Sequence, residues 1–286
     1  MSDNELGTYV RTRREAVTPA EVGLPVGARR RTPGLRRSEL ATLAGISVEY
    51  LTRLEQGRDR NPSPQVLGAL ADTLNLSIDE RLLLRRLAKA SGADAVMCTG
   101  AVDPPSRTVR PTVRAILDRL EPTPAVLVNW FGDVITYTDA YDRYARPLGI
   151  LDAGQPNILR YVFTDERART MYPEWERVAD EQIAHLRHEA PLQDPHVTAL
   201  ADELTVTAGA CFADRLAAVP TPPRRTGVDL VAHPEAGTLR LAYETLFLPD
   251  ADGRRLVVHL PADDATAAAL DRLNGRRPGA LRAVNG

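Results

Sequence analysis

Cysteine is scarce in this sequence. Only Cys98 and Cys211 are present, and they lie far apart in no spacing that a metal site uses. A reduced compartment therefore fits best, and we expect a cytoplasmic protein. No run of apolar residues reaches the length of a membrane span, and the first residues lack the basic and apolar stretches of a signal peptide. The sequence thus predicts no membrane partner.

Motifs of catalysis are missing as well. The chain has no G-x-S-x-G, no phosphate-binding loop and no paired nucleophile and base. His185 and His188 stand three residues apart on an expected helix and could present two metal ligands, but no third ligand lies at a supporting spacing. A solvated helix face is the favoured interpretation of this pair. We therefore expect no enzyme, no catalytic residue, no metal and no cofactor.

Lysine is nearly absent, because Lys89 is the single lysine among 36 basic residues. The arginine content can reflect a general preference for arginine over lysine, but such a preference does not change the sign of the charge. Residues 1–92 hold 15 basic against 11 acidic residues, whereas the rest of the chain holds 21 against 27. A basic first part on an acidic remainder predicts an anionic partner for the first part only.

The length of 286 residues is too great for one ordinary compact domain and sufficient for two. Residues 93–108 lack a hydrophobic period and end in a proline-rich stretch, so they are predicted to link a domain at 1–92 to one at 109–275. Residues 276–286 are rich in arginine, glycine and proline and are predicted to be a disordered tail.

The first domain is predicted to be all-helical. Helical periodicity and capping residues indicate five helices, over about 6–17, 35–44, 47–56, 63–74 and 77–90. Ser47, Ser63 and Ser77 stand at the expected N-caps. Gly45 and Gly57 follow the second and third helices, where glycine is typical.

The segment 35–60 carries the functional argument. A helix-turn-helix needs two short helices joined by a tight turn, with the second helix open to the major groove. Ala41 is small where the helices would cross, and Gly45 gives the turn its backbone freedom. The residues expected to face the core are Leu40, Ile46, Leu51 and Leu54. The residues left on the open side, which we expect to read bases, are Val48, Glu49, Thr52 and Arg53.

The chemistry of this open side suits duplex DNA. Arg53 can bond guanine at two atoms, Glu49 can accept from cytosine, and the Val48 and Thr52 methyl groups can contact thymine. An alternative for Glu49 and Arg53 is a pair with each other, four residues apart on the helix. The residues expected at phosphates or in the minor groove are Arg29, Arg30, Arg31, Arg36, Arg37, Ser47, Arg58 and Arg60. For the first three, a merely solvated basic loop is the alternative.

These residues resemble the XRE-type helix-turn-helix family, the phage-repressor-like domain. The match runs through Glu39-Leu40-Ala41, Gly45-Ile46-Ser47, Leu51-Thr52, Leu54-Glu55 and Gly57. The resemblance implies a lambda-repressor-like fold of five helices, with the third as recognition helix and an inward, structural role for Glu55. The insertion between the first two helices, which ends in the arginine-rich residues 29–37, resembles that of the actinobacterial branch whose members carry an MmyB-like C-terminal domain.

The second domain is predicted to be α+β with one mainly antiparallel sheet. Residues 125–130 and 133–138 indicate a β-hairpin. Helices are expected at 109–120, 139–146, 174–190, 194–218 and 263–273, and strands at 228–233, 239–248 and 255–260.

This domain resembles the MmyB-like family. The shared features are the hairpin near Trp130, Asn157-Ile158-Leu159-Arg160, Met171-Tyr172-Pro173-Glu174-Trp175-Glu176, His233-Pro234 and Tyr243-Glu244. The resemblance implies a PAS-like fold that binds a small apolar, for example fatty-acid-like, ligand. Aromatic residues that belong either to the core or to such a pocket are Trp130, Tyr161, Phe163, Tyr172 and Trp175.

Together these patterns predict a sequence-specific DNA-binding transcription regulator that binds double-stranded DNA as a homodimer and responds to a small apolar ligand. One alternative is a regulator whose second domain only dimerises or binds a protein partner. A catalytic second domain is disfavoured by the missing catalytic motifs.

Overall fold

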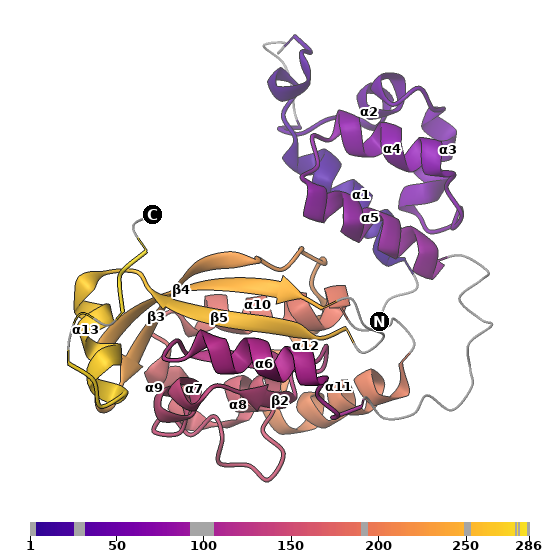
Figure 1. The fold of residues 1–286 in the computed structure, drawn as a ribbon. Coiled ribbons are helices and arrows are strands. Elements are labelled where there is room, and N and C mark those ends of the chain that lie inside the picture. Colours follow the sequence, from indigo (N-terminus) through magenta and orange to yellow (C-terminus); the bar gives the residue numbers. More distant parts are fainter. Residues whose placement is uncertain are drawn as a thin grey trace. The chain divides into compact units, whose positions relative to one another are not determined.

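The computed structural model describes residues 4–25, 32–91, 106–189, 194–248, 253–277, 279 and 281–284. The chain divides into two compact units (Figure 1), which are an N-terminal unit, Met1–Ala101 with Leu216–Pro222, and a C-terminal unit, Val102–Arg215 with Pro223–Gly286. Most of the expected linker, 93–105, lies outside the described residues, as do Arg29, Arg30 and Arg31. The linker prediction and the boundaries drawn from it stay predictions.

The N-terminal unit contains the five α-helices that the sequence predicts. They are α1 (Glu5–Ala16), α2 (Arg37–Leu43), α3 (Val48–Glu55), α4 (Pro64–Thr73) and α5 (Ile78–Ser91), with a short 3₁₀ turn η1 (Ala20–Val22) after the first. The Ser47 and Ser63 hydroxyl oxygens accept hydrogen bonds from the Tyr50 and Val66 N–H groups at 3.0 and 3.3 Å. Ser77 forms the expected capping box with Glu80. The start of each of these three helices is thus encoded locally.

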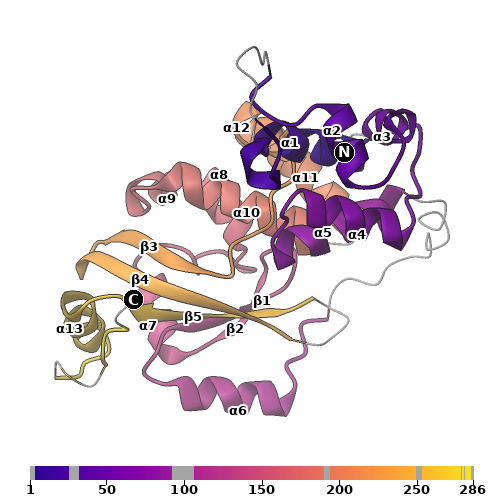
Figure 2. The ribbon, with the colours of Figure 1, turned by 90° about the horizontal axis from the view of Figure 1, so that it is seen from above.

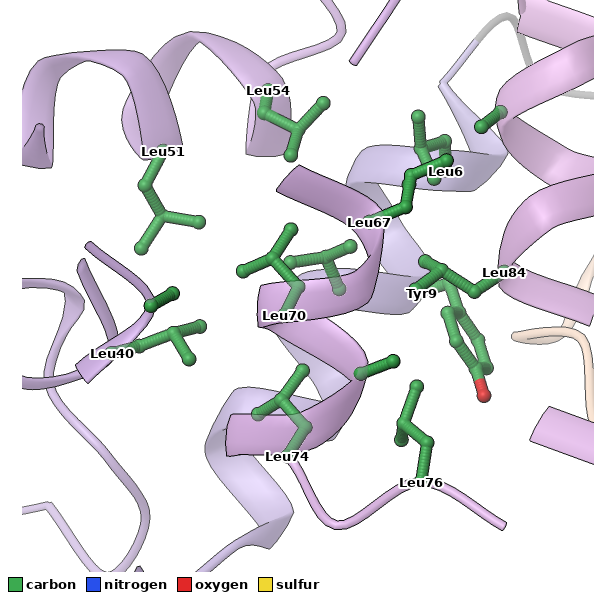
Figure 3. Packing of buried hydrophobic residues seen from close by; sticks show 14 of the residues in the cluster. Leu6, Tyr9, Leu40, Leu51, Leu54, Leu67, Leu70, Leu74, Leu76 and Leu84 are labelled. Carbon is green, nitrogen blue, oxygen red and sulfur yellow. The ribbon is translucent and has the colours of Figure 1, made fainter. Parts of the chain in front are cut away.

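One leucine-rich core holds the N-terminal helices together (Figure 3). Leu40 of α2 and Leu51 and Leu54 of α3 are fully buried, as the helical spacing predicts. Leu70 of α4 is likewise fully buried. Because α3 buries two leucines on one side, its opposite side remains available to a partner.

The C-terminal unit is built on one five-stranded sheet. The strands are β1 (Ala125–Val128), β2 (Val134–Tyr137), β3 (Thr226–His233), β4 (Gly237–Phe247) and β5 (Arg255–Pro261). Their order is β2-β1-β5-β4-β3, and each neighbouring pair is antiparallel. The predicted hairpin, the three late strands and the α+β class are confirmed. The more specific PAS-like arrangement stays a prediction.

Helices cover both faces of this sheet (Figure 2). On one face α6 (Pro111–Leu120) packs Val113 and Leu117 against apolar residues of β1 and β5. On the other face lie α7 (Asp139–Ala145), α8 (Ile158–Thr164) and α10 (Trp175–Glu189), whose side chains meet those of four strands around a cavity. The remaining helices are α9 (Glu166–Met171), α11 (Pro195–Ala208), α12 (Ala210–Ala217) and α13 (Asp264–Leu273).

The structure differs from the sequence prediction at three places in this unit. The short helices α8 and α9 were not predicted, because seven and six residues give too little periodicity. The expected helix 194–218 breaks at Gly209, whose φ of 62° leaves the helical region. The tail is not detached in its described part, since the Gly279 N–H donates to Asp271 and the Val284 N–H to the Pro261 carbonyl.

Candidate nucleic-acid interface and ligand cavity

The turn between α2 and α3 is tight. Gly45 has φ of 66°, a left-handed conformation that glycine adopts without strain. The Ile46 N–H then donates to the Ala41 carbonyl at 2.9 Å, which closes the end of α2. Ala41 is fully buried where the two helices approach. This geometry is that of a helix-turn-helix, with α3 in the place of the recognition helix.

The open face of α3 carries the four residues expected to read bases. The side chains of Glu49 and Arg53 are 83% and 48% exposed, and Val48 is 44% exposed. Thr52 is half-buried, and its hydroxyl donates to the Val48 carbonyl at 2.8 Å. The Arg53 Nη1 and Glu49 Oε1 atoms lie 3.6 Å apart, so the pair foreseen as an alternative forms. An exposed pair of this kind contributes little to stability and can be exchanged for DNA contacts.

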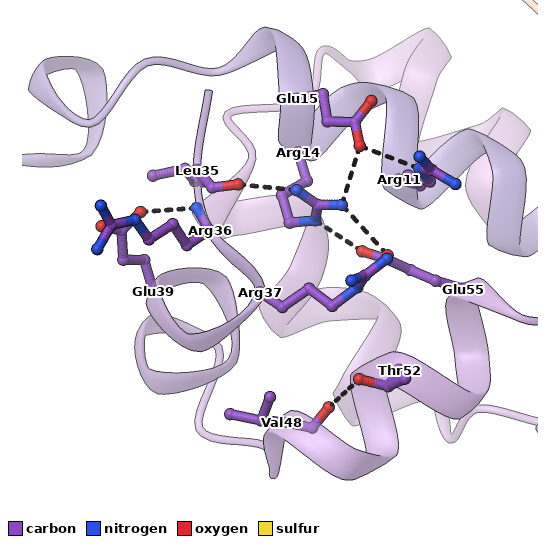
Figure 4. A network of polar contacts seen from close by, with 10 residues as sticks. All are labelled: Arg11, Arg14, Glu15, Leu35, Arg36, Arg37, Glu39, Val48, Thr52 and Glu55. Atoms are coloured by element: carbon purple, nitrogen blue, oxygen red, sulfur yellow. Dashed lines mark hydrogen bonds and ion pairs between the residues drawn. The ribbon is translucent and has the colours of Figure 1, made fainter. Parts of the chain in front are cut away.

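A buried ionic cluster fixes the C-terminal end of α3 (Figure 4). The Glu55 side chain is 1% exposed and accepts from Arg14 Nε at 2.7 Å and from Arg37 Nε at 2.8 Å. Arg14 Nη1 also donates to the Leu35 carbonyl at 2.8 Å. The cluster therefore ties α3 to α1, to the start of α2 and to the chain before it. This placement confirms the inward role of Glu55 that the resemblance implies.

Arg14 is the functional neighbour that the sequence interpretation missed. It lies four residues after Val10, on the face of α1 that otherwise buries apolar residues. Burial opposes its charge, but the hydrogen bonds and charges of Glu55 and Glu15 prevail and raise the pKa of Arg14. In a sequence, a single arginine on an otherwise apolar helix face, together with a glutamate expected to point inward elsewhere, indicates a buried arginine–glutamate ion pair.

The described residues that are expected to contact phosphate are all exposed. The exposed members are Arg36, Arg37, Ser47, Arg58 and Arg60. Arg37 already forms an ion pair with Glu55, and Arg60 Nε donates a hydrogen bond to the Gly57 carbonyl at 3.1 Å. Arg36 precedes α2, and its N–H donates to Glu39 at 2.7 Å. The start of α2 thus offers the guanidinium groups of Arg36 and Arg37, and helix starts favour anions.

Arg36 provides a test of phosphate contact. We expect Arg36→Ala to weaken binding to specific and random duplexes alike and to reduce the log–log salt slope by about 0.9, the value for one lost contact. Affinity titrations over a range of salt concentrations measure the slope. Arg85→Ala, which removes an exposed cation from α5, is the matched control. An unchanged slope in the Arg36 variant would show that Arg36 does not touch phosphate.

A cavity lies between the sheet of the C-terminal unit and α7, α8 and α10. It holds about 770 Å³ of empty space, open solvent at its mouth included. Its apolar walls are Val126, Val128, Ile150, Ile158, Val162, Val178 and Val257. Its polar and aromatic walls are Tyr141, Tyr144, Tyr172, Arg177, Glu181, Gln182, His185, Asp229, Tyr243, Thr245, Arg255 and His259. A concave site whose walls combine apolar side chains with convergent polar groups is typical of small-molecule binding.

The charges that line this cavity are paired within the protein. Arg177 Nη2 donates to Asp229 at 2.7 Å, and Glu181 accepts the Arg224 N–H. Burial raises the pKa of Glu181 to about 7 against the smaller opposing effects of the Arg224 N–H and nearby arginine charges. Burial also lowers the pKa of His259, which therefore stays neutral. The cavity thus disfavours additional unpaired charge.

The structure places the five aromatic residues of the expected pocket in different surroundings. Tyr172 lines the cavity, and the other four are not among its lining residues. Tyr161 Oη donates to the Leu148 carbonyl at 2.8 Å, and Trp175 Nε1 donates to the Val162 carbonyl at 2.9 Å. Phe163 packs edge-on against Trp175, and Trp130 stacks at a tilt beside its neighbour Phe131.

His185 requires a correction. The sequence favoured a solvated face for His185 and His188, but His185 is 6% exposed and lines the cavity. Its Nε2 atom lies 3.7 Å from Glu181 Oε1, one turn earlier on α10. Glu181 lies three residues after Val178, and His185 lies four residues after Glu181, so all three share the inward face of α10. This helical spacing was the signal available from the sequence.

Glu181 gives the C-terminal unit a predictable pH dependence. Because its pKa is raised from 4.5 to about 7, the folded unit binds this proton more tightly than the unfolded chain does. The free energy of unfolding therefore falls as the pH rises through this window. We expect Glu181→Gln to remove that fall and to stabilise the unit by up to about 3 kcal/mol at about pH 8.

Both tryptophans, Trp130 and Trp175, lie in the C-terminal unit, so denaturant unfolding followed by tryptophan fluorescence reports on this unit. Glu166→Gln, on the exposed surface of α9, is the control and should keep the parent pH dependence. Equal pH dependence in the parent and in Glu181→Gln would contradict the assignment.

Comparison with known proteins agrees with both parts of this description. Residues 5–84 match the model of a helix-turn-helix domain, and residues 109–273 match that of the MmyB-like transcription regulator ligand binding domain. A protein of Sinorhizobium fredii, named an uncharacterized HTH-type transcriptional regulator, is 39% identical over 62 residues, which are 22% of this chain and 80% of that protein. Among the described residues, no helix is long and apolar enough to cross a membrane. The chain belongs to the MmyB-like family of helix-turn-helix transcription regulators.

Proposed function

We propose that this regulator binds a specific duplex sequence through α3 and that a small ligand in the C-terminal cavity controls this binding. The open face of α3 is the observation that supports the first part most strongly. We assign base reading to Val48, Glu49, Thr52 and Arg53. Phosphate or minor-groove contacts are assigned to Arg29, Arg30, Arg31, Arg36, Arg37, Ser47, Arg58 and Arg60. The first three of these lie outside the described residues.

A homodimer is the proposed active form. One helix-turn-helix buries little surface on DNA and usually binds as half of a two-fold pair. The operator should then contain two related half-sites about one helical turn apart, or a multiple of that spacing. Selection of bound duplexes from a random library by the full-length protein tests this. Enrichment of a two-fold symmetric sequence is expected, and a bound pool with no enriched sequence would contradict the proposal.

Ligand control rests on the cavity and on the matched ligand-binding family. The valine and isoleucine walls support an apolar ligand body, and Tyr172 is the member of the expected pocket that contributes. Molecules released by denaturing extraction of the purified protein should change its affinity for the selected operator. A coupling of about 5- to 150-fold is the usual range for such control. Unchanged operator affinity in the presence of every released or added ligand would contradict ligand control.

One observation favours a second role for the C-terminal unit. Val228 and Leu246 are 44% and 48% exposed, and they alternate along β3 and β4 with the cavity-lining Asp229 and Thr245. They therefore face the opposite side of the sheet. Exposed apolar side chains on the edge strand β3 and on its neighbour β4, with the exposed Thr226 and Glu244 between them, suit a mixed contact with a second copy or with a protein partner. In that case the unit would support dimerisation whether or not the cavity is filled.

A further inference from the structure

The buried ionic cluster at the end of α3 holds more positive than negative charge. Its charged side chains are those of Arg11, Arg14, Glu15, Arg37 and Glu55, which ion pairs of 2.7–3.2 Å join to one another. Arg11 is paired with Glu15, and Arg14 forms two hydrogen bonds with Glu55. Arg37 is the third arginine on two glutamates, so the surplus positive charge lies there.

The two arginines that meet Glu55 do so in different ways. Arg14 is 6% exposed and donates to both carboxylate oxygens, from Nε at 2.7 Å and from Nη2 at 3.2 Å. Its other bonds go to the Leu35 carbonyl and to Glu15. Arg37 gives Glu55 its Nε alone, at 2.8 Å, and its side chain is 42% exposed. Glu55 therefore holds Arg37 by the inner end of the guanidinium group.

The outer end of the Arg37 guanidinium is open. Among the described residues, Nη1 and Nη2 of Arg37 have no hydrogen-bond partner. Figure 4 shows the side chain reaching from α2 to Glu55 at the end of α3. Arg37 is the first residue of α2, and the first helix of a helix-turn-helix crosses the DNA backbone. Two parallel donors at this position match the oxygens of a phosphate.

We propose that Glu55 is a positioning residue for DNA binding, which holds Arg37 by Nε so that Nη1 and Nη2 together bond one operator phosphate. The inference rests on the proposed operator binding and goes beyond the phosphate contact assigned to Arg37, because it makes a buried glutamate part of the interface. A long side chain loses rotamer freedom when it binds a partner. The bond to Glu55 restricts Arg37 before DNA arrives, so less freedom is lost on binding.

The alternative is a phosphate contact that needs only the charge of Arg37. Lysine would then serve as well as arginine, and Glu55 would affect DNA binding only through stability. A held guanidinium differs, because lysine ends in a single ammonium group without the planar fork. An ammonium that pairs with Glu55 leaves the outer position of the guanidinium empty. The two cases therefore predict different behaviour of Arg37→Lys and Glu55→Gln.

The test neutralises the phosphates of the selected operator one at a time with methylphosphonate linkages. The dissociation constants of the full-length protein for the neutralised and the native operator give a ratio for each linkage. Both constants come from the same variant, so a change in its folded fraction cancels. In the parent, neutralising a phosphate bonded by both Nη groups should raise this ratio to about ten or more. Arg37→Ala should bring the ratio at one such linkage in each half-site close to one.

Two further variants separate positioning from charge and from stability. Glu55→Gln leaves one acceptor oxygen, which the buried Arg14 retains, so Arg37 is released and the ratio at the same linkage should fall as in Arg37→Ala. Arg37→Lys should lower it as well. Glu15→Gln is the matched control, because Glu15 bonds Arg11 and Arg14 of the same cluster, and it should keep the parent ratio.

Three results would overturn the inference. They are a parent-like ratio in Glu55→Gln or in Arg37→Lys, an equal fall in Glu15→Gln, and the absence of any linkage that responds to Arg37→Ala. Selection of an operator by the parent protein is a separate measurement. The proposed operator binding therefore stands or falls independently of the role of Glu55.

Discussion

Replacing Glu55 with alanine should lower the free energy of unfolding of the N-terminal unit by about 3–5 kcal/mol, the usual cost of breaking a buried ion pair from one side. The variant leaves Arg14, which is 6% exposed, as a buried cation without its main partner. It also releases Arg37 from α3. Since the cluster fixes the end of the recognition helix, specific DNA binding should be lost together with stability.

Hydrogen exchange of peptides from α1 and α3 in the full-length protein measures this effect locally. Glu49→Ala removes an exposed glutamate from the same helix and is the matched control, with a loss of about 0.5 kcal/mol or less. Peptides of the C-terminal unit should exchange as in the parent. Parent-like protection of α1 and α3 in the Glu55 variant would show that the cluster does not hold the helices.

Replacing Phe212 with alanine should destabilise the C-terminal unit by about 3–5 kcal/mol. Phe212 of α12 is fully buried, and its ring lies 5.1 Å from that of Phe163 of α8 in an edge-on arrangement. Residues of α8, Ile158 and Val162, line the cavity. Loss of this support should therefore weaken ligand binding as well as folding.

Tryptophan fluorescence during denaturant unfolding follows this loss, because both tryptophans lie in the C-terminal unit. Val206→Ala, at a side chain that is 85% exposed on α11, is the control and should change the unfolding free energy by less than about 0.5 kcal/mol. A loss below about 1 kcal/mol in Phe212→Ala would mean that the aromatic cluster is not a structural core.

The DNA-binding helices follow from local sequence to a large extent. Serine caps, glycine stops and leucine spacing are short-range signals, and the structure has α3, α4 and α5 starting where Ser47, Ser63 and Ser77 predict. Arg14 was missed because its burial depends on Glu55, which is 41 residues away. Such a contact is decided by tertiary packing.

The cavity was even harder to predict from the sequence, because it too depends on tertiary packing. Its lining comes from β1, β3, β4, β5 and three helices, so no single stretch of sequence shows it. The type of a residue also did not show whether its side chain lines the cavity or belongs to the hydrophobic core. Tyr172 lines the cavity, whereas Trp175, three residues later, bonds the Val162 carbonyl through its ring nitrogen. The spacing of Val178, Glu181 and His185 places them on one face of α10, but the fact that this face lines a cavity depends on how α10 packs against the sheet.

The energies of the two contacts indicate how Arg53 can exchange Glu49 for a base on DNA. The Glu49–Arg53 pair stabilises the free helix by only about 0.2–0.5 kcal/mol. A bidentate contact between arginine and guanine discriminates against the wrong base by about 1–3 kcal/mol. The second quantity exceeds the first, so DNA can draw Arg53 away from Glu49 at little cost.

The most direct test is a binding-site selection performed with the full-length parent and with Arg53→Ala. We predict that the variant keeps its fold, loses base preference at one position in each half-site, and binds random duplexes nearly as well as the parent. Glu49→Gln should alter the preference at a neighbouring position. If the sequences selected by Arg53→Ala match those of the parent at every position, Arg53 does not read bases and the proposed docking of α3 is wrong.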